Sequence, residues 1–229
     1  MATHLDLEEQ EQLAQLKSFW NQYGNLITWM LILVLGGYAA WNGWNWWQRE
    51  QATKAAALFD ELDRAAQAGD VDKVGRAFDD LKERYPGTAF AEQGGLLAAK
   101  VQADKGNNDA ARASLGWVAE HAVETEYRTA AKLRLAGVLM EAKQYDEALQ
   151  TLDSAAAPAF EALIADRRGD VLLAMGRKDD AKAAYEKARG AMDSGVEYRR
   201  LIEAKLAALG AAAALNAAVP AAGASESKP

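Results

Sequence analysis

Few residues in this sequence could carry out chemistry. The only histidines are His4 and His121, and there is no cysteine, which excludes disulfides, thiolate metal sites and thiol catalysis. No histidine pair has the spacing of a transition-metal site, so no ligand set is evident. Glycine-rich phosphate-binding fingerprints are absent as well. We therefore expect neither an enzyme nor a bound metal or cofactor.

Acidic residues form two adjacent pairs, Asp79-Asp80 and Asp179-Asp180. Both pairs stand where predicted helices meet solvent, which favours a charged surface over an acid–base site. The letters Arg-Gly-Asp occur at 168–170, but inside a predicted helix and around a close-packing glycine. The net charge of -7 and the lack of a Lys/Arg cluster argue against nucleic-acid binding.

An uncharged run covers residues 18–48, and its apolar part from 26 to 47 predicts a transmembrane helix over 23–48. Aromatic residues stand at both ends, as is typical of membrane interfaces. The preceding tail, residues 1–22, is acidic and predicted to be loose or partly helical. A cleaved signal peptide would need a basic start and a small-residue cleavage site, so we expect an anchor that stays.

Small residues Gly36, Ala40 and Gly43 share one face of the predicted transmembrane helix. Such a face would let a neighbouring helix approach closely and predicts a helix contact. The alternative is that Gly and Ala are simply common in membrane spans. Lys17 before the span and Arg49 and Lys54 after it lean weakly towards a cytoplasmic domain, and this count leaves the topology open.

The remainder of the chain contains an internal repeat with offsets of 37, 37 and 33 residues. Each unit has a helix with small or apolar contacts, a turn, and a second helix with a small or apolar residue followed four positions later by a large one. A period near 34 predicts tetratricopeptide (TPR) hairpins that stack to bury their faces. A plain helical bundle is the alternative. The turn position falls on Gly69, Gly106, Lys143 and Gly176.

We therefore predict an all-α protein: a single transmembrane helix followed by a TPR-like α-solenoid of about four helical hairpins over residues 49–210. A last helix, near 196–209, is expected to cap the stack with Leu201, Lys205 and Leu206 on one side. Residues 211–229 are Ala-rich with little apolar bulk and are predicted to be a disordered tail.

The first helices of a TPR stack line its concave face, which predicts a partner-binding groove, apolar with acidic positions. Such a groove suits a helix or an extended segment of a partner, although several of its leucines could be ordinary core. Its predicted residues are Leu96, Lys100, Leu133, Met140, Leu163, Asp166, Asp170 and Leu173.

Together, the acidic tail ending near Trp20, the span with its aromatic cluster, the four hairpins and the stretch at 164–176 (Ile-Ala-Asp-Arg-Arg-Gly-Asp-Val-Leu-Leu-Ala-Met-Gly) resemble the YfgM family. The resemblance implies an ancillary subunit of the bacterial SecYEG translocon, in the inner membrane with a cytoplasmic amino terminus and a periplasmic domain. It also implies association with the membrane-anchored chaperone PpiD and transfer of newly translocated proteins to periplasmic chaperones. It implies no enzymatic activity.

The sequence thus favours a non-enzymatic adaptor that links protein translocation to periplasmic chaperones or client polypeptides. A TPR scaffold for cell-envelope or outer-membrane protein assembly would use the same solenoid, and the identity of crosslinked neighbours would separate the two. A membrane-tethered enzyme is the third reading, which turnover by the purified protein would support.

Overall fold

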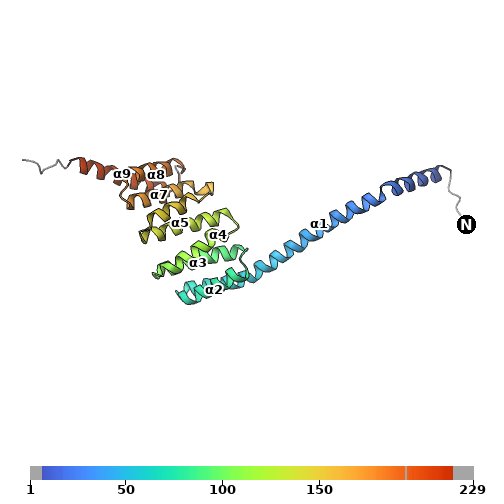
Figure 1. Ribbon diagram of the computed structural model, residues 1–229, viewed down its shortest axis with the longest axis horizontal. Coiled ribbons are helices and arrows are strands. Elements are labelled where there is room, and N and C mark those ends of the chain that lie inside the picture. Colours follow the sequence, from blue (N-terminus) through green and yellow to red (C-terminus); the bar gives the residue numbers. More distant parts are fainter. Residues whose placement is uncertain (1–6, 194, 219–229) are drawn as a thin grey trace, which may run out of the picture. The chain divides into compact units, whose positions relative to one another are not determined.

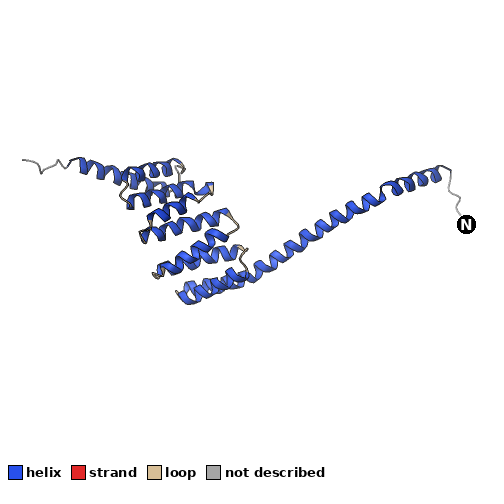
Figure 2. Cartoon of the chain, viewed as in Figure 1, coloured by secondary structure: helices blue, strands red, loops and turns tan. Residues whose placement is uncertain are grey.

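The computed structural model describes residues 7–193 and 195–218, which contain helices and no strand (Figure 2). The predicted all-α fold is confirmed. The chain divides into two compact units after Thr53. The helices are α1 (Leu7–Gln67), α2 (Val71–Arg84), α3 (Ala89–Asp104), α4 (Asn108–His121), α5 (Thr125–Glu141), α6 (Tyr145–Asp153), the 3-10 turn η1 (Pro158–Phe160), α7 (Glu161–Ala174), α8 (Lys178–Gly190) and α9 (Tyr198–Ala218) (Figure 1).

The first unit is the amino-terminal part of α1. The helix begins at Leu7, well before the predicted start of the span at residue 23, so the tail is helical from there on. Residues 1–6 lie outside the described residues. Strong helix formers such as Glu, Gln, Leu and Ala fill this segment and explain its helicity. Among the described residues, one helix is long and apolar enough to cross a membrane, the Glu11–Gln67 part of α1.

Polar side chains inside the apolar stretch of α1 bond to their own helix. The Thr28 hydroxyl donates to the carbonyl of Gly24 at 2.7 Å, and the Asn42 amide donates to that of Tyr38 at 2.9 Å. A side chain bonded four residues back does not need water as a partner. This arrangement suits a helix surrounded by lipid.

The second unit is a stack of helical hairpins (Figure 1). Residues 54–67 of α1 and α2 bury Leu62, Val74 and Phe78 in one core cluster with α3. The pairs α3–α4, α5–α6 and α7–α8 follow, and each hairpin packs on the next. The carboxy-terminal part of α1 therefore supplies the first helix of the first hairpin.

The four predicted turn positions share one backbone conformation. Gly69, Gly106, Lys143 and Gly176 all have positive φ, between 61° and 80°. In every turn the next residue donates its N–H to the carbonyl five positions back, at 2.8 to 3.0 Å, as in a Schellman motif. Lys143 departs from the glycine pattern in sequence but not in geometry.

The second helices repeat one buried pattern, a small or apolar residue followed four positions later by a large one. In each hairpin both side chains are at most 2% exposed. The predicted repeat is therefore confirmed by its core. The pairs are Val74 and Phe78, Ala111 and Leu115, Ala148 and Leu152, and Ala181 and Tyr185.

Glycine in the first helices permits close contact with these large side chains. A Cβ on Gly169 would lie 2.5 Å from the Tyr185 ring, and one on Gly95 would lie 2.4 Å from Val118 and 2.9 Å from Phe78. No side chain larger than hydrogen fits at such distances. The predicted close-packing role of Gly169 is correct, and it explains the glycine in the Arg-Gly-Asp letters.

The shortened repeat has its cause in the lengths of α6 and α7. This helix has 9 residues, whereas α2 and α4 have 14 each. The chain then continues through η1, which begins at Pro158 and leads into α7. This longer connection restores most of the residues that α6 lacks. The last offset is 33 residues rather than 37 because α7 is also shorter, with 14 residues against 16 in α3 and 17 in α5.

Polar side chains of two first helices hold the following loops. The Thr129 hydroxyl accepts from the N–H of Ala157 at 3.2 Å, and the Glu92 carboxylate, 37 residues earlier, accepts from that of Val123 at 2.6 Å. Glu92 is 1% exposed, and its second oxygen has no hydrogen-bond partner among the described residues. Burial raises the pKa of the Glu92 carboxyl above its usual range.

The final helix differs from the prediction in its bounds and its buried face. Ile202 is fully buried, whereas Leu201 is 47% exposed, because Ile202 shares a helix face with the half-buried Lys205 and Leu206. α9 also continues to Ala218, past the predicted start of a disordered tail at residue 211. Residues 219–229 lie outside the described residues.

Lys143→Gly should stabilise the domain, because a left-handed conformation strains any residue with a Cβ. The expected gain is about 0.5–1 kcal/mol, or about 1–4 °C in Tm for a domain of this size. Thermal unfolding of the full chain in detergent, followed by circular dichroism, measures it. Lys143→Ala keeps the Cβ and should give no gain, so equal melting of the two variants would contradict the explanation.

Candidate functional site

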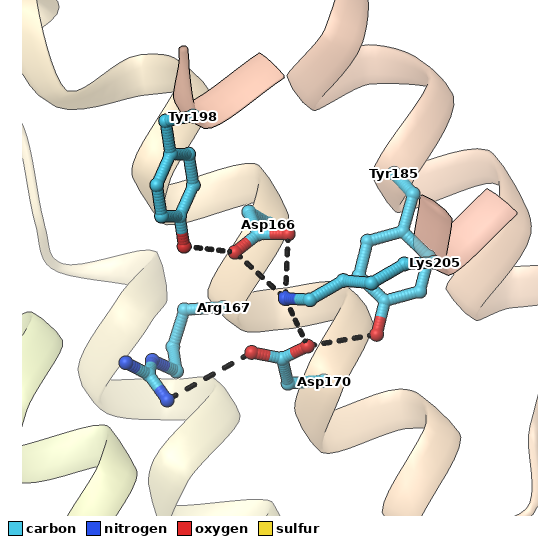
Figure 3. Close-up of polar contacts among 6 residues, drawn as sticks. All are labelled: Asp166, Arg167, Asp170, Tyr185, Tyr198 and Lys205. Atoms are coloured by element: carbon cyan, nitrogen blue, oxygen red, sulfur yellow. Dashed lines mark hydrogen bonds and ion pairs between the residues drawn. The ribbon is translucent and has the colours of Figure 1, made fainter. Parts of the chain in front are cut away.

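The end of the stack holds a group of polar side chains around two acids of α7 (Figure 3). Asp166 and Asp170 lie one helical turn apart on one face. Lys205 of α9 places its Nζ between them, 2.8 and 2.9 Å from the two Asp166 oxygens and 2.6 Å from Asp170 Oδ1. One ammonium group thus bridges both carboxylates.

Two tyrosines complete the α9 polar cluster, which we define as Asp166, Asp170, Tyr185, Tyr198 and Lys205. The Tyr185 hydroxyl donates to Asp170 Oδ1 and the Tyr198 hydroxyl to Asp166 Oδ2, both at 2.8 Å. The Lys205 ammonium also lies 5.2 Å from the centre of the Tyr185 ring. These contacts join α7, α8 and α9.

Burial and hydrogen bonding keep both phenols protonated. Burial, followed by the hydrogen bond to Asp170, raises the pKa of Tyr185 well above its usual range. Burial, followed by the hydrogen bond to Asp166, raises the pKa of Tyr198 to about 12. At neutral pH the tyrosines therefore act as donors to the two carboxylates. This chemistry fastens α9 to the last hairpin.

The predicted groove requires a correction at its acidic positions. The Asp166 side chain is 3% exposed, and its oxygens are bonded to Lys205 and Tyr198. Asp170 is likewise bound by Lys205 and Tyr185. Both acids were predicted to line the groove, but Lys205 and Tyr198 of α9 and Tyr185 of α8 donate to them. They do not form open acidic positions.

The other predicted groove residues differ in exposure. Leu96 is 8% exposed and belongs to a core cluster, so it is not available to a partner. Leu133 and Met140 are half-buried against the core of the third hairpin, and Leu163 is also half-buried. Leu173 is exposed. The predicted groove is therefore not one continuous apolar surface.

Lys100 is exposed and bonded to Asp104 at 2.6 Å. Both residues line a hollow of about 270 Å³ between residues 63–69 and α3, with Leu97 and Val101 supplying apolar wall. Lys100 therefore lines a small cleft at the first two hairpins.

The small residues of α1 face open space. A Cβ added at Gly36 or Gly43 would meet nothing within 4 Å, and Ala40 is exposed. They belong to a longer stripe, not recognised in the sequence analysis, whose spacing alternates between three and four residues. That heptad spacing favours a left-handed crossing with closest approach at the small central residues. Its members are Leu26, Trp29, Leu33, Gly36, Ala40, Gly43 and Trp47.

His121 and the two acidic pairs lie outside the α9 polar cluster. His121 is exposed, and its ring stacks on Trp117 with a centroid distance of 5.2 Å. Asp79 pairs with Lys82 and Asp180 with Arg177, each at 2.7 Å. Across residues 7–193 and 195–218, no group of three His, Asp or Glu side chains could hold a metal ion.

The repeats and the apolar helix define a class: TPR-like proteins with one candidate membrane helix. Residues 17–211 match the family described as tetratricopeptide repeat-like domain. The chain is 30% identical to the ancillary SecYEG translocon subunit of Neisseria gonorrhoeae, over 91% of this chain and all of that protein. Proteins of the same name from Haemophilus influenzae and Escherichia coli are 31% and 29% identical, over 80% and 78% of this chain and 89% and 85% of theirs. The chain belongs to this YfgM family of ancillary SecYEG translocon subunits.

Lys205→Met should destabilise the domain by about 2–3 kcal/mol, because it leaves two largely buried carboxylates without their cation. Urea unfolding of the full chain in detergent measures the loss. Adding Asp166→Asn should recover part of it, since the most buried charge is then removed.

The matched control is Lys187→Met. Lys187 pairs with Glu161 at 3.2 Å, but both side chains are more than half exposed, so its loss should be below about 0.5 kcal/mol. Equal losses for the two lysine variants would show that the cluster does not fasten α9.

Proposed function

We propose that this protein is a non-enzymatic adaptor of the bacterial inner membrane, ancillary to the SecYEG translocon. The observation that carries the proposal is the extent of similarity to the Neisseria gonorrhoeae subunit, which includes the apolar helix as well as the repeats. Its TPR-like domain links translocation to periplasmic chaperones. A stack of helical repeats fits a binding role.

The proposed orientation has residues 1–22 in the cytoplasm and the repeats in the periplasm. The family resemblance supports it, whereas the few charges around the span lean the other way. Long domains cross membranes largely regardless of their charge, so these few charges do not oppose a periplasmic repeat domain.

The proposed membrane contact uses the heptad stripe of α1. Gly36, Ala40 and Gly43 leave room at its centre, so a helix of the translocon or of its companion could pack closely against them. Trp29 and Trp47 lie on the same stripe beyond the small residues and would limit the contact at both ends.

The proposed partners of the repeat domain are a PpiD-like membrane-anchored chaperone and other periplasmic chaperones or client polypeptides. The half-buried Leu133, Met140 and Leu163 and the exposed Leu173 offer apolar surface on the first helices. Such surface suits a helix or an extended segment of a partner.

Changing Gly36, Ala40 and Gly43 together to Leu should reduce co-purification with SecYEG, because the added side chains fill the contact face. A matched pair tests the stripe itself. Gly36→Leu lies on the stripe and Gly37→Leu lies off it, although a Cβ at either position meets nothing within 4 Å. Unchanged recovery of the triple variant, or equal effects of the pair, would remove the stripe from the contact.

A photo-crosslinking residue at Met140 should capture a periplasmic chaperone in cells, because Met140 lies on the proposed binding face. The same probe at the exposed Lys182, on the second helix of the last hairpin, is the control and should capture it less. Partners are identified by mass spectrometry. Cytoplasmic partners at Met140 would contradict the orientation, and outer-membrane assembly factors would favour the envelope-scaffold reading.

A further inference from the structure

Three arginines occupy the same position in successive first helices. Arg134 lies in α5, Arg167 in α7 and Arg200 in α9, each 33 residues after the one before. The buried residues Ala136, Gly169 and Ile202 follow with the same spacing. α9 therefore continues the register of the first helices, and the three arginines form a row.

The first two guanidinium groups lie across the preceding first helix. Arg134 Nη1 reaches the carbonyl of Leu96 in α3 at 3.4 Å. Arg167 Nη1 lies 3.7 Å from the place of a Cβ on Gly137 in α5, which is an ordinary van der Waals distance. The row thus lies on the face formed by the first helices, where Arg200 continues it by register.

Nearby acids are already engaged elsewhere, which leaves these guanidinium groups weakly paired. Asp170 lies 3.8 Å from Arg167 and forms its close bonds with Lys205 and Tyr185 instead. Glu203 pairs with Arg199. In the described part of the chain, no hydrogen bond or ion pair engages the exposed Arg200 side chain.

Two other arginines of the domain, Arg112 and Arg177, form close bonds with acidic or amide side chains. Arg112 binds both Gln144 and Glu147, and Arg177 binds Asp180 at 2.7 Å. A guanidinium group carries five N–H donors arranged to fit a carboxylate. The row therefore presents unused donors at regular intervals, although the whole chain is acidic.

We propose that the row of Arg134, Arg167 and Arg200 binds an extended acidic segment of a partner protein. This inference rests on the proposed adaptor function and specifies the chemistry of its partner. Packed helices lie about 10 Å apart and an extended chain rises about 3.3 Å per residue, so acidic side chains about three residues apart would match the row. Leu133 stands one position before Arg134, and Leu163 stands four positions before Arg167. Both leucines are half-buried and would contact apolar side chains that lie between the acidic residues of the partner segment.

The test is fluorescence anisotropy with the full chain in a neutral detergent. The probe is a labelled peptide with three Glu separated by Leu-Pro, and a second peptide has Lys in place of each Glu. The Glu peptide should bind and weaken as salt rises, whereas the Lys peptide should not bind. The change of Arg134, Arg167 and Arg200 together to Gln should weaken binding about tenfold.

The matched control changes the exposed Arg76, Arg84 and Arg189 of the second helices to Gln, which alters the net charge equally and should leave binding unchanged. Changing the row to Glu should transfer binding to the Lys peptide, a gain that a misfolded variant cannot show. The proposal would be overturned if the unaltered chain did not bind the Glu peptide, or if the Gln variant of the row bound it as tightly as the unaltered chain. It would also be overturned if the control variant lost as much binding as the row variant.

Co-purification with SecYEG separates this inference from the proposed function. Loss of peptide binding with retained co-purification in the row variant is expected, since α1 is unchanged. If the unaltered chain binds the Glu peptide but never co-purifies with SecYEG, the adaptor function fails and the acidic-segment site stands.

Discussion

The repeat domain depends on the close approach of its helices, which needs a small residue opposite a large one. The Tyr185 ring packs against Gly169, and Val118 and Phe78 pack against Gly95. These contacts leave no space for a Cβ at either glycine. A single hairpin cannot bury its apolar face alone, so the stability of each unit comes from its neighbours. The buried small and large residues of α2, α4, α6 and α8 are therefore the basis of the whole stack.

The features that follow from local pattern were predictable. Gly69, Gly106 and Gly176 indicated turns because helices often end at a left-handed glycine. The repeat placed Lys143 at the same turn position, but its left-handed conformation was not predicted. Periodicity also predicted the buried second helices. The helical start at Leu7 was underestimated, because a short polar segment was considered without the long helix that continues it.

The features that depend on partners distant in sequence were not predictable. Spacing placed Asp166 and Asp170 on one face of α7, but nothing local indicates a lysine more than thirty residues later. Leu201 and Ile202 are equally apolar, and only the packing of α9 decides which one is buried. Asp170 forms its close bonds with Lys205 and Tyr185, which leaves Arg167 only weakly paired. The buried polar cluster therefore affects the charge of the exposed surface.

The sequence distance within the α9 polar cluster has a consequence for how the chain is made. Lys205 follows Asp166 by 39 residues. Ribosomes add about 5–20 residues per second, so the acids of α7 exist for about 2–8 seconds before their cation is synthesised. During this time the last hairpin lacks its counter-charge and its covering helix. A chain that ends before Lys205 therefore leaves both carboxylates without the cation that bridges them.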